Sequence, residues 1–148
     1  MSSFRQILYH IIFRTKASAK TLPLAECEEL YRYIWGIIKN KGGTLLRIGG
    51  MEEHVHILSD LPPTIALADF IREIKTYSSR WLKNHQQFPA FMGWADGYAA
   101  LTYAWRDKDM IVHYIKNQRD HHKQTDFMTE YRQLLEEHGV QIDERFFP

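Results

Sequence analysis

The sequence Glu53-His54-Val55-His56-Ile57-Leu58 places two histidines in a short apolar run that has the composition of a β-strand. Successive side chains of a strand point to opposite faces, so His54 and His56 would share one face. Val55 and Ile57 would then point to the other face. Two imidazoles side by side on a strand can hold a metal ion, although histidines at this spacing also occur as partly exposed residues without a ligand.

Two further strands and one helix are predicted around this histidine strand. Residues 7–15 are rich in aromatic and β-branched residues, and residues 44–48 would pair with the histidine strand in an antiparallel hairpin connected through Gly49-Gly50. Apolar residues recur at three- and four-residue spacing over about 24–41, which predicts an amphipathic helix. Gly42-Gly43 suits the end of that helix, because glycine tolerates a left-handed cap.

The second half of the chain is predicted to supply one more strand and several helices. Pro62-Pro63-Thr64 opens a helix, residues 97–105 form a strand, and helices follow over about 108–123 and 127–137. The order strand, helix, strand, strand, helix, strand predicts an α+β, ferredoxin-like antiparallel sheet with added C-terminal helices. Two helices would cover one face of the sheet and leave the other face free to hold chemistry.

Length and composition indicate a single globular domain over residues 1–148. No apolar run is long enough to cross a bilayer, and the N-terminus lacks a signal-peptide pattern, so we expect a cytoplasmic protein with no membrane partner. Cys27 is the one cysteine, which excludes an internal disulfide and favours a reducing compartment. Its place among apolar helix positions favours a core residue over a nucleophile. Acidic residues near the C-terminus, Glu130 among them, are typical of a solvated face.

Basic side chains gather in the helix that follows the histidine strand. The net charge of the chain is +1, which does not by itself indicate nucleic-acid binding. The basic residues of this helix are Arg72, Lys75, Arg80 and Lys83. They could hold DNA phosphates, and aromatic residues of the segment 88–94 could stack on bases. A solvated basic face, with Phe91 and Trp94 covering the core, is the simpler interpretation.

Tyr114 and Gln118 lie four positions apart in the helix predicted over about 108–123, and therefore on one face of it. A tyrosine oxygen can act as a nucleophile, and a glutamine offers an uncharged oxygen ligand. Judged on this helix alone, a packing aromatic and a surface amide are the simpler interpretation. His121-His122 follows and is expected at a solvated helix end. No role is predicted for the remaining histidines, which are His10, His85, His113 and His138.

With the histidine pair and the Tyr114–Gln118 pair in this strand order, the chain resembles the single-tyrosine HUH transposases of bacterial insertion sequences of the IS200/IS605 type. The letters HUH denote histidine, a hydrophobic residue and histidine. The resemblance covers nearly the whole chain. It implies a Rep-like version of the ferredoxin-like sheet. It also implies that His54, His56 and Gln118 are metal ligands and that Tyr114 attacks a DNA phosphodiester. Members of the family are dimers, so a homodimer is expected, and the tyrosine helix can complete the partner's site.

The activity implied by this resemblance is transposition of single-stranded DNA with hairpin-bearing ends. Metal-assisted attack of Tyr114 would give a covalent 5′-phosphotyrosine intermediate and a free 3′ hydroxyl, which strand transfer would resolve. Mg²⁺ or Mn²⁺ is the expected metal, since imidazole suits manganese and magnesium is abundant. The alternatives left open are an HUH endonuclease that acts on repeated palindromes, a replication initiator, and a catalytically silent protein that binds hairpin DNA.

Overall fold

The computed structural model describes residues 3–148, and its centre is a four-stranded antiparallel sheet in the order β2-β3-β1-β4. The strands are β1 (Leu8–Arg14), β2 (Leu45–Met51), β3 (His54–Asp60) and β4 (Ala99–Thr102). The histidine strand β3 is an inner strand that pairs with both β1 and β2. The predicted ferredoxin-like sheet and the predicted hairpin are thus confirmed.

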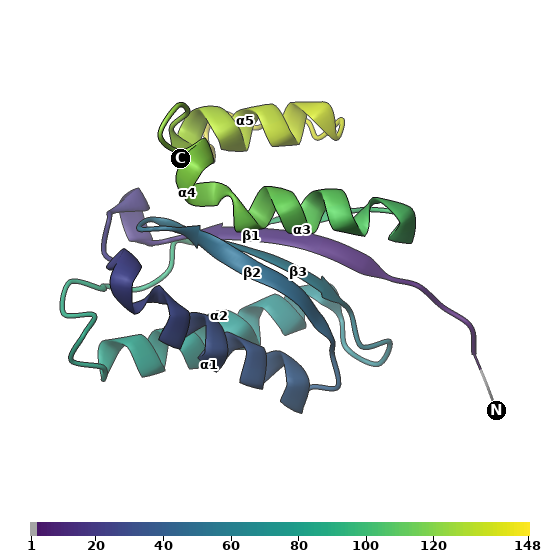
Figure 1. Ribbon diagram of the computed structural model, residues 1–148, viewed down its shortest axis with the longest axis horizontal. Helices are drawn as coiled ribbons and strands as arrows, with labels where there is room; N and C mark the ends of the chain where they lie inside the picture. Colours follow the sequence, from purple (N-terminus) through teal and green to yellow (C-terminus); the bar gives the residue numbers. More distant parts are fainter. Residues whose placement is uncertain (1–2) are drawn as a thin grey trace.

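Within residues 3–148, five α-helices lie on the two faces of this sheet. They are α1 (Cys27–Asn40), α2 (Leu67–Lys83), α3 (Lys108–Lys116), α4 (Gln118–His121) and α5 (Phe127–Glu137). Short 3₁₀ turns occur at Lys16–Ser18, Leu24–Glu26 and Trp105–Asp107. In Figure 1, α1 and α2 lie on one side of the sheet, and α3, α4 and α5 lie on the other.

The main core lies between the sheet and the α1–α2 layer. Val55 and Ile57 point into it from β3, opposite to the histidines, as their alternation predicts. Buried apolar residues of α1 and α2 complete this core: Leu30, Ile34, Ile38, Phe70, Ile71 and Ile74. Cys27 is fully buried here, and burial raises the pKa of its thiol to about 11, so its prediction as a core residue is confirmed.

The second face of the sheet is covered as well, contrary to the prediction of a free face. Leu8 and Leu58 pack with Ile111 and Ile115 of α3. Ile12 packs in a separate cluster with residues of β4 and α5. Both faces of the inner strands carry apolar side chains, so a single helical layer cannot bury them all. His54 and His56 therefore lie between the sheet and the C-terminal helices, with no exposed surface.

Several element boundaries differ from the predicted ones. Strand β2 runs through Gly49 and Gly50 to Met51, and both glycines face close backbone neighbours. A Cβ at Gly49 would lie 2.8 Å from the carbonyl oxygen of Ile115, so the absence of a side chain lets α3 approach the sheet. The predicted helix over 108–123 divides at Asn117, which leaves the helical conformation. Across residues 3–148, no helix is both long enough and apolar enough to span a bilayer.

Candidate active site

Four side chains singled out in the sequence meet in one buried cluster on the α3–α5 face of the sheet. Strand β3 supplies His54 and His56, α3 supplies Tyr114, and Gln118 is the first residue of α4. Nε2 of His54 lies 3.1 Å from Oε1 of Gln118. The ring centroids of His56 and Tyr114 are 5.7 Å apart. The chain thus brings both imidazoles, the amide and the phenol together within one protomer.

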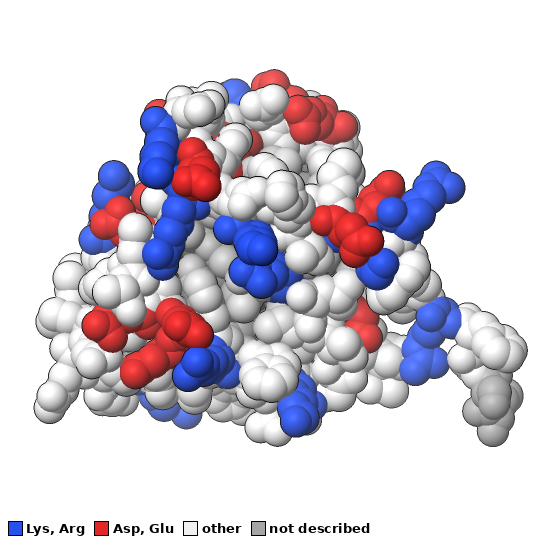
Figure 2. Space-filling view, in the orientation of Figure 1, with Lys and Arg blue, Asp and Glu red and all other residues white. Residues whose placement is uncertain are grey.

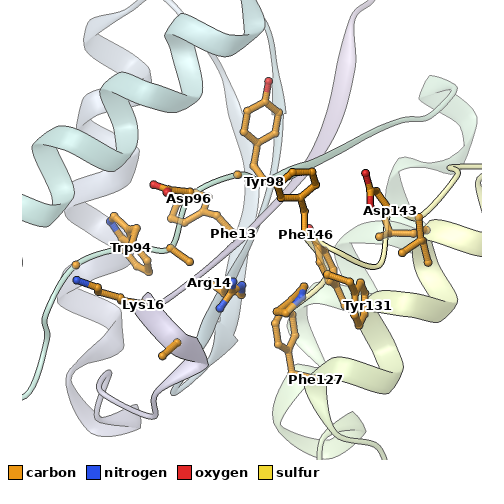
Figure 3. A pocket seen from close by; sticks show the side chains of 18 of the residues that line it. Phe13, Arg14, Lys16, Trp94, Asp96, Tyr98, Phe127, Tyr131, Asp143 and Phe146 are labelled. Carbon is orange, nitrogen blue, oxygen red and sulfur yellow. The ribbon is translucent and has the colours of Figure 1, made fainter.

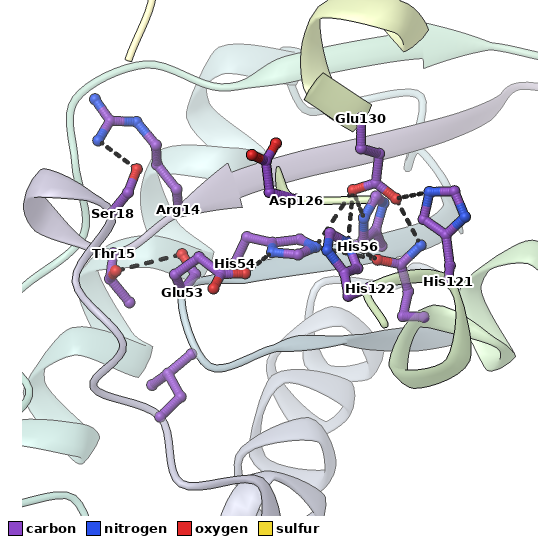
Figure 4. A network of polar contacts seen from close by, with 12 residues as sticks. Arg14, Thr15, Ser18, Glu53, His54, His56, His121, His122, Asp126 and Glu130 are labelled. Atoms are coloured by element: carbon purple, nitrogen blue, oxygen red, sulfur yellow. Dashed lines mark hydrogen bonds and ion pairs between the residues drawn. The ribbon is translucent and has the colours of Figure 1, made fainter. Parts of the chain in front are cut away.

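Glu130 of α5 occupies the middle of this cluster, as Figure 4 shows. Its side chain is 2 % exposed, and its Oε1 lies 3.3 Å from Nε2 of His56 and 3.6 Å from Nε2 of His54. Its Oε2 accepts hydrogen bonds from the hydroxyl of Tyr114 and, at 3.0 Å, from Nε2 of Gln118. The prediction of Glu130 as part of a solvated acidic tail is therefore wrong.

The start of α5 explains why Glu130 reaches the cluster. Asp126 is the N-cap of this helix, and its carboxylate accepts the backbone N–H of Thr129 at 2.8 Å. Phe127 directly follows this cap and Glu130 lies three positions further on, so both side chains share the buried side of the helix. The ring of Phe127 stacks on His54 with the centroids 4.2 Å apart and the planes at 15°. This arrangement could not be seen in the sequence, because Glu130 lies 74 positions after His56.

His122 also joins the cluster, so the expectation of a solvated helix end at His121-His122 is wrong. Its Nε2 lies 3.0 Å from Oε1 of Gln118 and 3.1 Å from Oε1 of Glu130. His121 is more exposed, with Nε2 at 3.4 Å from Oε2 of Glu130. The positions 114, 118 and 122 follow one another at helical four-residue spacing, a signal that could have identified His122.

The two strand histidines are each held by a second residue. Nδ1 of His54 lies 2.6 Å from Oε1 of Glu53, and Nδ1 of His56 lies 2.7 Å from Nε2 of His10. A proton on Nδ1 of His54, donated to Glu53, leaves the Nε2 lone pair directed at the cluster. His10, for which the sequence predicted no role, thus orients His56.

Burial and mutual contact fix the charge states of the cluster. Burial lowers the pKa of His56 to about 4, which keeps this imidazole neutral at pH 7. Burial acts to raise the pKa of Glu130, but hydrogen bonds to His122 and His56 outweigh it and hold that pKa well below its usual range. Burial, and then the charge of Glu130, raise the pKa of Tyr114. The resting cluster therefore contains a carboxylate and a protonated phenol.

The donor set fits a divalent metal ion. One nitrogen each from His54 and His122 and one oxygen from Glu130 lie within 4.8 Å of one another. His56 and Gln118 border the same point with a neutral imidazole nitrogen and an amide oxygen. Two or three imidazoles with carboxylate and amide oxygens form a mixed set that suits manganese and tolerates magnesium.

The four basic residues of α2 lie outside this cluster. Nζ of Lys75 donates to the carbonyl oxygens of Ala95 at 2.7 Å and Gly97 at 3.0 Å, which ties α2 to the segment before β4. Arg72 pairs with Asp69 at 3.2 Å. Lys75, Arg80 and Lys83 line a shallow hollow of about 460 Å³. Elsewhere on the molecule, basic and acidic side chains are interspersed on the face seen in Figure 2.

Comparison with known proteins places this cluster in a family context. The family model "Transposase IS200 like" matches residues 3–118, a range that includes His54, His56, Tyr114 and Gln118. The ISDra2 transposase TnpA of Deinococcus radiodurans is 27 % identical over 120 residues, which cover 78 % of this chain and 86 % of that protein. His122 and Glu130 lie beyond the range of the family match.

Two solved structures share the fold. A crystal structure of a protein assigned as a transposase, from Deinococcus radiodurans R1, superposes with a TM-score of 0.57 and 26 % identity, covering 80 % of this chain and 98 % of that chain. A REP-associated tyrosine transposase bound to a REP hairpin gives a TM-score of 0.60 at 16 % identity, covering 82 % of this chain and 74 % of that chain. The second likeness is one of fold.

Proposed function

Because the chain belongs to the IS200-like transposase family, and is thus a DNA-cleaving transposase, we propose that it cuts and rejoins single-stranded DNA through a covalent intermediate on Tyr114. The observation that carries this proposal is the buried cluster in which Tyr114, Gln118 and the histidine pair converge on Glu130. A phenol beside metal-ligating groups is the arrangement required for nucleophilic attack on a phosphodiester.

In the proposed reaction, the oxygen of Tyr114 forms a bond to the scissile phosphorus, and the bond from phosphorus to the 3′ oxygen breaks. The phenol must lose its proton, and Glu130 already accepts the hydrogen bond of that hydroxyl. The departing 3′ oxygen takes up a proton and leaves as a free 3′ hydroxyl. One phosphodiester replaces another, so a second 3′ hydroxyl can reverse the step and join strands without nucleotide fuel.

The proposed metal ligands are His54, His56 and Gln118, with His122 and Glu130 adjacent to them. A bound Mg²⁺ or Mn²⁺ would neutralise charge on the scissile phosphate. His10 and Glu53 hold the two strand imidazoles in orientation through their Nδ1 atoms. The apolar cover formed by Phe127 on His54 restricts water at this edge of the cluster.

The proposed substrate is DNA with a hairpin near its end. The solved REP-associated tyrosine transposase of the same fold is bound to a REP hairpin, which supports a hairpin ligand for this chain. A homodimer remains part of the proposal. Tyr114 and the strand histidines of one protomer already lie together, which supports a site assembled from a single chain.

The proposal is tested by incubating the purified protein with labelled hairpin oligonucleotides drawn from the flanks of its own gene, with Mn²⁺ or with a chelator. We expect a cleaved strand and a protein-linked strand with Mn²⁺, and neither product with the chelator. A mobility shift of the hairpin without any cleavage under both conditions would instead identify a silent DNA-binding protein.

A further inference from the structure

A cleft of about 990 Å³ opens beside the buried cluster, between two walls that are distant in sequence. One wall comes from the end of β1 and the turn after it, from Ser79 and Lys83 of α2, and from residues 92–98. The other comes from α5 and from residues 140–148 of the C-terminal segment. Figure 3 shows Arg14 between the two walls, with Trp94 on one side and Phe127 and Tyr131 on the other.

The cleft reaches the candidate active site at two points. Phe127 lines the cleft and stacks on His54 with the ring centroids 4.2 Å apart. Arg14 is the cross-strand neighbour of His54 in the β1–β3 pair, so both residues project from the same face of the sheet. A molecule lying in the cleft would therefore have one end separated from His54 by the ring of Phe127.

The cations of the cleft are available to an anionic ligand. Nη1 of Arg14 donates to the hydroxyl of Ser18 at 3.1 Å. The basic residues that line the cleft are Arg14, Lys16, Lys83 and Arg145. Arg145 pairs with Asp143, whereas within residues 3–148 none of the other three forms an ion pair with a carboxylate. Three unpaired cations around one cleft favour a polyanion over a neutral ligand.

The two acids of the cleft are partly neutralised. A carboxylate oxygen of Asp143 lies 2.7 Å from a guanidinium nitrogen of Arg145. Asp96 lies close enough to Lys75 to favour the charged form of that lysine, although burial dominates and lowers the pKa of Lys75. The field inside the cleft is thus set by the unpaired cations rather than by these carboxylates.

Aromatic rings at the mouth of the cleft provide exposed stacking surfaces, and the guanidinium of Arg145 lies 5.3 Å from the centre of the Phe146 ring. Tyr98 is 40 % exposed and Phe146 is 78 % exposed, on opposite walls. Large aromatic side chains are costly to leave in water without a partner. Aromatic faces beside backbone-binding cations are the combination by which proteins hold unpaired nucleotides.

We propose that this cleft holds unpaired nucleotides that flank the scissile phosphate, with Arg14 contacting the backbone and Tyr98 and Phe146 stacking on bases. This inference rests on the proposed function, since it concerns the strand on which Tyr114 acts. The wall formed by α5 and residues 140–148 lies beyond the range of the family match, whereas the opposite wall lies within it.

The experiment measures the affinity of the full-length protein for labelled hairpins with no flank, with an unpaired 5′ flank and with an unpaired 3′ flank. We expect one flank to tighten binding by wild type. The double variant Tyr98→Ala/Phe146→Ala should lose at least about fivefold, and up to roughly 150-fold, in affinity for that flanked hairpin, which is the range expected for the loss of one stacked base. Affinity for the hairpin without a flank should stay unchanged. Arg14→Gln should weaken the salt dependence for the same flanked substrate.

The matched control is Trp35→Ala, which removes an aromatic residue of similar exposure (51 %) from α1, on the other side of the sheet. This variant should bind both hairpins like wild type. Equal binding of flanked hairpin by wild type and the double variant overturns the cleft proposal, as does an equal loss with and without the flank. Failure of the wild-type protein to form any protein-linked strand overturns the proposed function instead. The two failures are distinguishable, because the binding assay tests the cleft and the cleavage assay tests the function.

Discussion

Tyr114 of α3 donates a hydrogen bond to Glu130 of α5, a residue sixteen positions further along the chain. The same carboxylate contacts His56 and Gln118, so one buried anion links the proposed nucleophile to the proposed metal ligands. Because α5 provides this anion, the C-terminal helix is part of the candidate site and not only a cover for the sheet.

Replacement of Glu130 by alanine is expected to destabilise the metal-free protein. The change leaves the half-buried hydroxyl of Tyr114 and the buried amide of Gln118 without their acceptor, and we expect a loss of about 2 to 4 kcal/mol in the free energy of unfolding. Urea unfolding in the presence of a chelator measures this. The control Glu136→Ala removes an exposed carboxylate from the same helix and should have little effect. Equal stability of the two variants would show that Glu130 does not organise the cluster.

Metal binding is expected to stabilise the protein through His54. With Mn²⁺ at about a hundredfold over its dissociation constant, the melting temperature of wild type should rise by roughly 5 to 10 °C. His54→Ala should abolish most of this rise, whereas His85→Ala, which alters a histidine paired with Glu29, should keep it. If Mn²⁺ raises the melting temperature of His54→Ala as much as that of wild type, the proposed ligand set is wrong.

Gly49 is expected to control the position of the tyrosine helix. A Cβ at this position would lie 2.8 Å from the carbonyl oxygen of Ile115, next to Tyr114 in sequence. Gly49→Ala should push α3 from the sheet, cost about 1 to 3 kcal/mol of stability and reduce formation of the tyrosine-linked strand. Gly36→Ala is the matched control, since nothing lies within 4 Å of its Cβ. That helical substitution should stabilise the protein by about 0.5 to 1 kcal/mol.

The sheet and its layers could be predicted because their signals are local. The alternation around His54 and the helical spacing in α1 and α2 are each set within a dozen residues. The second apolar face was missed because residues such as Ile12 and Leu58 do not reveal by themselves which helix will cover them. The break at Asn117 was missed because no glycine or proline marks it in the sequence.

The candidate site could be predicted only where its residues follow a short motif. His54 and His56 alternate on a strand, and Tyr114 and Gln118 repeat on a helix, so each pair is visible in sequence. Glu130 and His10 reach the same cluster through tertiary packing, and a buried glutamate in an acidic segment has the same sequence signal as a solvated one. Gln118 was visible while His122 was overlooked, although both obey the same four-residue spacing.

The basic residues of α2 are expected to contribute unequally to DNA binding. Lys83 lines both the cleft and the adjoining hollow, whereas Arg72 lines neither and pairs with Asp69. Lys83→Gln should reduce the salt dependence of binding to a flanked hairpin by roughly one counterion, and Arg72→Gln should reduce it less. Titrations between low and moderate salt give both slopes. A larger change in salt dependence for Arg72→Gln than for Lys83→Gln would show that the DNA does not follow the cleft.

The central claim is that Tyr114 is the residue that becomes joined to DNA. The most direct test digests the protein-linked strand formed with Mn²⁺ and locates the attached nucleotide by tandem mass spectrometry. We predict a 5′-phosphate ester on Tyr114, and no adduct with Tyr114→Phe, while Tyr103→Phe, which alters a tyrosine packed beside it, still forms the adduct. An adduct on another residue, or an undiminished adduct with Tyr114→Phe, would contradict the account.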